Sequence, residues 1–348
     1  REFLEYNKDP DLLGREIENL YKKPDKRKSL TVWIDEIQKI PQLLDVVHHC
    51  IEKYKSCRFI LTGSSARKLR RDSANLLGGR ALDLRLHSLA YEELAEAFDL
   101  DLALYYGTLP HIYELLENND VDLAKDLLSS YVTTYLNDEI RQEGLVRSLD
   151  SFQRFVEVAA AQFAELVNFS KIADDCLTSS PTVQNYYSIL EDTLIGSFLS
   201  PYASSVRKQL SKQSKFYFFD NGVTRAITGD LASRSHRMDK GHLFEQLVFN
   251  ELRKVNDYHK KSLKFNLWRT YDGLEVDFLI SRGRNLLLAV ECKSASQVQP
   301  RDFVGLKSFS VDFPKVRKVL CCTTKNSLIH DDIEVIDLPT LLGIVQAL

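Results

Sequence analysis

Three charged residues near the C-terminal end of the sequence have the types and the spacing needed to hold a metal beside a phosphate. Glu291 and Lys293 lie two residues apart after the apolar run 286–290, and Asp277 precedes Glu291 by 14 residues. Residues two apart on a strand face the same side, so a neighbouring strand can place Asp277 beside the pair. The carboxylates would bind Mg²⁺ or Mn²⁺, and the lysine would orient or deprotonate an attacking water and stabilise the phosphate.

Glu245, on a long amphipathic helix upstream, is a further candidate metal ligand. With Asp277, Glu291 and Lys293 it resembles the PD-(D/E)xK restriction-endonuclease-like superfamily, with Val276 where that motif often has proline. The resemblance implies a Mg²⁺-dependent endonuclease in which Glu291 and Lys293 are catalytic. Two alternatives stay open: an acid-x-Lys pair can be a surface ion pair worth at most about 1 kcal/mol, and such folds also serve as binding modules.

A second acidic pair, Asp35-Glu36, follows the apolar run 30–34, which predicts a strand covered on both faces. At the end of such a strand Asp35 would hold Mg²⁺ through water, and Glu36 would polarise a water that attacks a nucleotide phosphate. Two solvated acids in an exposed loop are the alternative.

Polar residues at the end of the next predicted strand, 58–62, and beyond it strengthen the interpretation as a nucleotide site. Thr62 and Ser64 would stand where a hydroxyl can sense a γ-phosphate, and Arg80 offers a cation that could reach phosphate. Hydroxyls at strand ends and N-caps are common, and an arginine before a strand is often a surface charge. The next run, 81–89, alternates apolar and polar residues and predicts a half-exposed third strand.

Residues 33–41, 61–65 and 79–81 together resemble one group of prokaryotic AAA-type ATPases that carry a C-terminal domain of unknown function, number 4143. The turn 107–110 matches that group's Gly-Gly-x-Pro element loosely, with Thr108 for the second glycine. The resemblance extends over essentially the whole chain. It implies binding of ATP and Mg²⁺, with Asp35, Thr62, Ser64 and Arg80 near the nucleotide.

The phosphate-cradling loop Gly-x-x-x-x-Gly-Lys-[Ser/Thr] does not occur in the sequence. The chain begins with Arg1, and its only methionine is Met238. We therefore expect an ATPase in the full-length protein, with a segment before Arg1 that supplies the loop, and no ATP hydrolysis by the chain as printed. A degenerate domain is the alternative.

The middle of the sequence predicts a helix-turn-helix followed by a strand at 216–219, which is winged-helix-like and agrees with the family resemblance. DNA would be read by the exposed face of the second helix and held by basic residues on its phosphates. The candidate contacts are Gln184, Asn185, Arg207, Lys208, Lys212 and Lys215. Winged helices also mediate protein contacts, and Glu191, Asp192 and the overall charge weaken the DNA interpretation.

These elements predict an α/β multidomain chain. Its expected parts are a partial AAA-type P-loop NTPase sheet at 1–95, a helical segment at 96–150, a winged-helix-like domain at 151–232 and a restriction-endonuclease-like α/β domain at 233–348. With 46 Lys+Arg against 49 Asp+Glu the net charge is −3, so any DNA contact must be local. A non-catalytic nucleotide-regulated scaffold and a winged-helix regulator are alternative functions, and a homo-oligomer or protein partner stays open.

No apolar run approaches the roughly 20 residues that span a bilayer, and no signal peptide opens the chain. The six cysteines form no CxxC pair, which favours buried thiols in a reducing compartment over a disulfide or zinc framework. We expect a cytoplasmic protein without a membrane partner.

Overall fold

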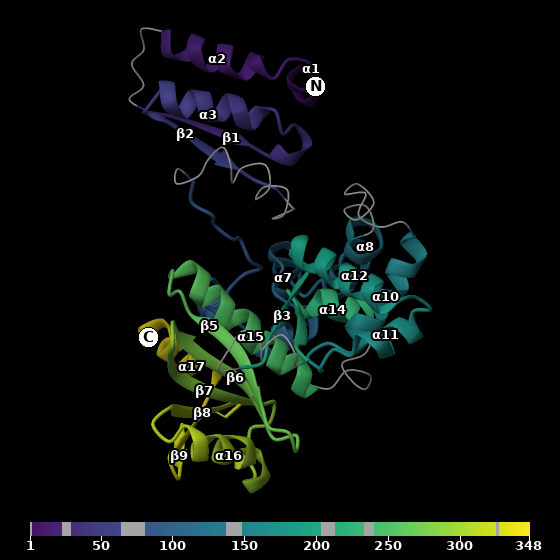
Figure 1. Cartoon of the computed structure of the whole chain (residues 1–348), viewed down its shortest axis with the longest axis vertical. Coiled ribbons are helices and arrows are strands. Elements are labelled where there is room, and N and C mark those ends of the chain that lie inside the picture. Colours follow the sequence, from purple (N-terminus) through teal and green to yellow (C-terminus); the bar gives the residue numbers. More distant parts are fainter. Residues whose placement is uncertain are drawn as a thin grey trace. The chain divides into compact units, whose positions relative to one another are not determined.

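The computed structural model describes residues 2–22, 29–63, 81–136, 148–202, 213–232, 240–324 and 327–348. The chain divides into two compact units, one built from Arg1–Asp83 and the other from Leu84–Glu191 with Ile195–Leu348 (Figure 1). Each unit has its own hydrophobic core, and each is described by itself below.

The first unit is a small α/β layer. Its elements are α1 (Glu2–Lys8), α2 (Asp11–Lys22), β1 (Leu30–Ile34), a 3-10 turn (Ile37–Lys39), α3 (Leu43–Lys53) and β2 (Cys57–Leu61). Strands β1 and β2 are parallel, with Leu30 opposite Cys57. Figure 1 shows α2 and α3 side by side, and the apolar residues of both helices pack on the inner face of the strands.

Two expectations for this region are wrong. Strands β1 and β2 are not covered on both faces: alternate residues point away from the helices, and Trp33 and Ile60 are 71% and 51% exposed. In the described residues only these two strands pair here, and α2 and α3 cover a single face. Residues 81–89 form no strand, since they have no ladder partner, and Leu86 is 92% exposed.

The second unit begins with short helices, as the sequence predicts for 96–150. They are α5 (Tyr91–Leu94), α6 (Leu100–Tyr106), α7 (Pro110–Glu117), α8 (Val121–Ser130) and one further turn (Tyr131–Leu136). The chain turns at Gly107 between α6 and α7. This residue has φ 75°, and a Cβ there would overlap the carboxylate of Asp220, so only glycine fits. Pro110 then occupies the first turn of α7.

Three helices and a hairpin follow. They are α10 (Leu149–Ala161), α11 (Phe169–Asp175), α12 (Ser180–Asp192) and the antiparallel strands β3 (Gly196–Leu199) and β4 (Lys215–Phe218), which lead into α14 (Asn221–Ile227). Asn168 caps α11 by accepting from the backbone N–H of Lys171. The ring of Tyr187 contacts the rings of Phe155 and Phe216 and so packs the hairpin against the helices.

The C-terminal part is a six-stranded mixed sheet between helices, as Figure 1 shows. Its elements are α15 (Lys240–Tyr258), β5 (Lys264–Arg269), β6 (Glu275–Arg282), β7 (Asn285–Lys293), α16 (Val304–Asp312), β8 (Arg317–Cys322), β9 (Leu328–His330), β10 (Ile333–Ile336) and α17 (Leu338–Ala347). The strand order is β5-β6-β7-β8-β10-β9. Helices α15 and α17 pack on one face and α16 on the other. The long helix predicted around Glu245 and the strand predicted at 286–290 are confirmed as α15 and β7.

All six cysteines are buried free thiols, as predicted. Burial raises the pKa of the Cys292 and Cys321 thiols well above their ordinary value, which keeps them protonated. Among the described helices, none combines the length and the apolar character needed to cross a membrane.

Candidate functional site

The predicted C-terminal residues come together at one place, which we call the acidic centre. Helix α15 contributes Glu245, strand β6 contributes Asp277, and strand β7 contributes Glu291 and Lys293. Glu275, two residues before Asp277 on β6, is a fifth member that the sequence did not indicate. Glu245, Asp277 and Glu291 are each less than 9% exposed, so three carboxylates lie inside the protein.

A buried lysine from outside the C-terminal domain is the sixth member of the acidic centre. Lys215 opens strand β4 and is 5% exposed. Its Nζ lies 2.7 Å from Glu245 Oε1 and 2.5 Å from Glu275 Oε1, and 3.6 Å from Asp277 Oδ1. The ammonium is therefore enclosed by carboxylate oxygens from two separate elements.

Further hydrogen bonds hold the carboxylates in place. Tyr217, two residues after Lys215 and on the same side of β4, donates to Glu245 Oε1 at 2.5 Å. The backbone N–H of Cys292 donates to Asp277 Oδ2 at 2.8 Å. Burial raises the pKa of Tyr217 well above its usual value, so the phenol stays a donor.

Glu291 and Lys293 form the outer half of the acidic centre. Lys293 Nζ lies 2.7 Å from Glu291 Oε1, and its side chain is 35% exposed. The other oxygen, Glu291 Oε2, is buried and has no hydrogen-bond partner among the described residues. Helix α16 approaches β6 closely here: a Cβ on Gly305 would meet the carbonyl oxygen of Glu275 at 2.0 Å.

The electrostatics reflect an excess of buried acids. Burial, with the charge of Asp277, raises the pKa of Glu245 to about 7, although Lys215 lowers it. Burial and Asp277 likewise raise the pKa of Glu291 well above its usual value. Burial alone would lower the pKa of Lys215, but the surrounding carboxylates raise it well above the ordinary lysine value, so this side chain is an ammonium.

A divalent metal does not fit this arrangement. Nowhere in the described part of the chain are three His, Cys, Asp or Glu side chains placed to hold a metal ion. Glu245, Asp277 and Glu291 are near one another as predicted, but Lys215 occupies the position between the first two. In the described residues a lysine–carboxylate cluster thus stands where the sequence predicts a metal site.

The predicted DNA contacts have three outcomes. Gln184 and Asn185 are exposed on α12, as expected. The prediction for Lys215 is wrong. This residue starts a strand with no exposed face, so its side chain is buried and ion-paired and cannot contact a DNA phosphate. Arg207, Lys208 and Lys212 lie outside the described residues.

The predicted nucleotide residues of the first unit also come together in part. The Thr62 hydroxyl donates to Asp35 Oδ1, and the backbone N–H of Glu36 donates to Thr62 Oγ1 at 3.3 Å. Glu36 has φ 53°, a left-handed conformation that turns the chain sharply after β1. Its carboxylate accepts from Gln38 Nε2 at 2.7 Å. Ser64 and Arg80 lie outside the described residues.

Comparison with known protein families identifies domains at the N-terminal and C-terminal ends of the chain. Residues 2–95 match an AAA domain, residues 97–234 match a Domain of unknown function (DUF8612), and residues 240–341 match a Domain of unknown function (DUF4143). The chain carries an AAA domain and a DUF4143 domain. The middle match spans both the predicted helical segment and the predicted winged-helix-like segment.

Two relatives are uncharacterized proteins. One, from Haemophilus influenzae, is 23% identical over 283 residues, which are 76% of this chain and 66% of the relative. The other, from Methanocaldococcus jannaschii, is 22% identical over 286 residues, which are 76% of this chain and 62% of the relative. The chain thus spans less than two thirds of the length of either relative. No solved structure matches the chain.

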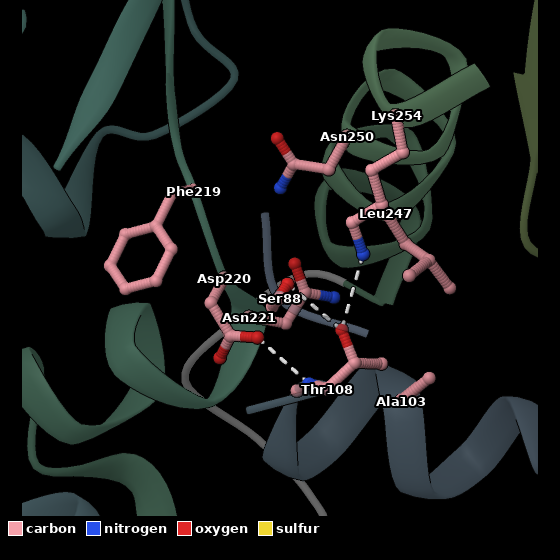
Figure 2. Close-up of a pocket in the computed structure, with 10 residues that line it drawn as sticks. Ser88, Ala103, Thr108, Phe219, Asp220, Asn221, Leu247, Asn250 and Lys254 are labelled. Atoms are coloured by element: carbon pink, nitrogen blue, oxygen red, sulfur yellow. Dashed lines mark hydrogen bonds between the residues drawn. The ribbon is translucent and has the colours of Figure 1, made fainter. Parts of the chain in front are cut away.

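A second buried lysine lies on α15, in a polar cluster that we call the Lys254 node (Ser88, Thr108, Asp220, Glu251 and Lys254). Lys254 Nζ donates to Glu251 Oε1 at 2.7 Å and to Thr108 Oγ1 at 3.2 Å, and also to the carbonyl oxygen of Leu89 at 2.8 Å. The backbone N–H of Thr108 donates to Asp220 Oδ2 at 2.8 Å. Figure 2 shows the side chains of Ser88, Thr108, Asp220 and Lys254 converging around a small cavity.

Residues 87–92, near the end of the region that matches the AAA domain, contact α15 through polar groups. His87 lies 2.9 Å from Asp257, and its backbone N–H donates to Tyr258 Oη at 3.0 Å. The backbone N–H of Tyr91 donates to Glu251 Oε2 at 2.8 Å. Residues 87–92 are therefore attached to the helix that also carries Glu245.

Proposed function

We propose that this protein is a nucleotide-regulated scaffold that holds DNA without cutting it. In this proposal an AAA domain is coupled to a restriction-endonuclease-like domain that serves as a binding module. The observation that carries the proposal is the acidic centre, where Lys215 lies between the carboxylates of Glu245 and Asp277, and Lys293 pairs with Glu291.

The element order supports a restriction-endonuclease-like fold. Helix α15 is followed by the antiparallel strands β5, β6 and β7, then by α16, and then by β8 parallel to β7. The acidic residues stand at the start of β6 and the end of β7, which are neighbouring positions because the two strands are antiparallel. Function must still be argued from the site, since one fold serves many chemistries.

The middle segment supports contact with DNA. Helices α10, α11 and α12 followed by the β3–β4 hairpin have the order of a winged helix, in which the third helix enters the major groove. The exposed side chains of α12 include Gln184, Asn185 and Ser188, which carry donors and acceptors for base edges and phosphates.

The AAA domain supplies the nucleotide dependence. Asp35 would hold Mg²⁺ through water, and Glu36 would polarise the attacking water, both near the Thr62 hydroxyl. The chain leads from this domain into residues 87–92, which are hydrogen-bonded to α15. Nucleotide state would in this way alter how the rest of the chain holds DNA.

DNA binding is tested by fluorescence anisotropy with a labelled duplex at several salt concentrations. The double substitution Gln184→Glu and Asn185→Glu places two negative charges on α12 and is expected to weaken binding at least about tenfold, because these charges repel phosphates. Gln346→Glu, the same chemical change on α17, is the matched control and should bind like wild type. Equal binding by all three proteins would refute DNA contact through α12.

A metal-dependent nuclease is the second candidate, favoured by the Glu291–Lys293 pair at the end of an apolar strand. Plasmid and linear DNA incubated with Mg²⁺ or Mn²⁺ decide between the two functions. The scaffold proposal expects intact DNA. Cleavage that disappears in both Lys293→Ala and Glu291→Gln would establish the nuclease instead.

A further inference from the structure

The position of Lys215 in the fold is unusual for a lysine. Strand β4 belongs to the hairpin of the middle segment, and every residue of the strand is buried. Its first side chain leaves the hairpin and enters the C-terminal domain, where it meets residues of α15 and β6. A buried ammonium is costly unless charged groups and hydrogen bonds compensate for the lost water.

The ammonium of Lys215 is surrounded by three carboxylates. Two carboxylate oxygens, from Glu245 and Glu275, lie within 2.7 Å of Nζ, and an oxygen of Asp277 lies 3.6 Å away. Hard cations such as Mg²⁺ and Mn²⁺ select this kind of all-oxygen shell. The ammonium therefore compensates the charges that a divalent cation would otherwise compensate.

We propose that Lys215 is the resident cation of the acidic centre, that it excludes a divalent metal, and that it fastens the β3–β4 hairpin to the C-terminal sheet. Tyr217 assists by donating from the same strand to Glu245. The role of Lys215 is independent of DNA binding by α12, because it concerns only the interior of the second unit.

The remaining members of the acidic centre show what removal of Lys215 would leave. Glu245, Glu275 and Asp277 would face one another without the ammonium, and buried like charges repel strongly. Arg269, 3.0 Å from Glu275, neutralises only the exposed edge. Glu291 Oε2 is already a buried acceptor without a hydrogen-bond donor among the described residues. The cluster without Lys215 thus lacks a cation and offers oxygen ligands for one.

The test compares wild type with Lys215→Met, which removes the charge and keeps most of the side-chain volume. Thermal unfolding and isothermal titration are measured with millimolar Mn²⁺. Wild type is expected to respond to Mn²⁺ weakly or not at all. The variant is expected to unfold at a lower temperature, to regain stability with Mn²⁺, and to bind Mn²⁺ at least about tenfold more tightly than wild type.

Two further variants make the test specific. Lys318→Met removes another buried lysine, which pairs with Asp332 on the far side of the sheet from α15's Glu245, and should not create Mn²⁺ binding. Adding Glu245→Gln to Lys215→Met should abolish the Mn²⁺ response. If Lys215→Met does not fold alone, refolding in Mn²⁺ should recover it.

Two results would overturn the proposal. One is Mn²⁺ binding by wild type that Asp277→Asn abolishes, which would show that Lys215 does not exclude the metal. The other is a Lys215→Met protein, folded or unfolded, that Mn²⁺ does not affect. Neither measurement involves DNA, so failure here and failure of the DNA-binding proposal are distinguishable.

Discussion

The acidic centre and the Lys254 node are both buried lysine–carboxylate clusters on α15, but they differ in how their oxygens are satisfied. In the Lys254 node, Glu251 accepts from Lys254 through Oε1 and from the backbone N–H of Tyr91 through Oε2. Asp220 accepts from two backbone N–H groups. In the acidic centre, Glu291 Oε2 has no such partner in the described part of the chain.

This difference distinguishes a cluster whose hydrogen bonds are complete from one in which they are incomplete. A buried charge whose hydrogen bonds are complete stabilises one arrangement of the chain, and losing either partner is costly. Carboxylates that crowd together with incomplete partners are strained, which is typical of sites shaped for a ligand or a reaction. The contrast predicts that loss of Lys254 destabilises the protein, whereas loss of the Glu291 charge stabilises it.

The largest effect is expected in the Lys254 node. Lys254→Met leaves the buried Glu251 carboxylate without its cation and frees the Leu89 carbonyl oxygen, so the free energy of unfolding should fall by about 3–5 kcal/mol. Urea unfolding followed by circular dichroism measures this loss. The control is the double variant Lys254→Met with Glu251→Gln, which removes both charges.

The double variant should lose less stability than the sum of its two single changes, because the neutral amide introduced by Glu251→Gln no longer needs the ammonium. Purely additive losses would mean that the two residues do not act as a pair. If Lys254→Met lowered the free energy of unfolding by less than about 1 kcal/mol, the Lys254 node would be no stronger than an exposed ion pair.

In the acidic centre, neutralising Glu291 is expected to have the opposite effect on stability. Glu291→Gln removes a buried charge and keeps an oxygen that can accept from Lys293, so the free energy of unfolding should rise by about 1 kcal/mol. The same urea experiment measures it. A loss of stability similar to that of Lys254→Met would show that Glu291 is a structural residue.

The stability difference between Glu291→Gln and wild type should depend on pH. Burial and Asp277 raise the pKa of Glu291 in the folded state above its ordinary value of 4.5, so the folded protein binds this proton more tightly than the unfolded chain does. The contribution of Glu291 to the free energy of unfolding of the wild type therefore decreases as pH rises above 4.5. The glutamine variant has no such decrease, because its side chain does not titrate. The variant's advantage should widen from about pH 5 to about pH 7, and a constant or shrinking advantage would contradict the assignment.

The sequence indicated Glu245, Asp277, Glu291 and Lys293 as members of the acidic centre, but not Glu275 or Lys215. Glu291 and Lys293 share a side because residues two apart on a strand do, and the apolar strands around them were recognisable. Lys215 reaches the centre only through tertiary packing of a hairpin from the middle segment. The one local signal was a lysine that opens an entirely apolar strand, since such a lysine must be buried with a partner.

In the first unit too, the local sequence did not predict which elements pack against one another. The continuous apolar run of β1 predicts cover on both faces, but coverage depends on which elements pair with it, and Trp33 is exposed. The alternation in 81–89 predicts a strand, yet a strand needs a partner that the local pattern does not specify. Asp35 and Thr62 lie next to each other because parallel strands end at the same edge of a sheet.

The smallest effect is expected for an ion pair at the surface of the same sheet. Arg317 on β8 binds both carboxylate oxygens of Glu334 on β10, at 2.6 and 2.8 Å, but its side chain is 44% exposed. Water and salt screen this pair, so Arg317→Ala should lower the free energy of unfolding by no more than about 1 kcal/mol, and high salt should reduce the loss. Urea unfolding at two salt concentrations measures both effects. If Arg317→Ala lowered the free energy of unfolding as much as Lys254→Met does, and independently of salt, burial would not explain why the buried lysines matter more than this exposed pair.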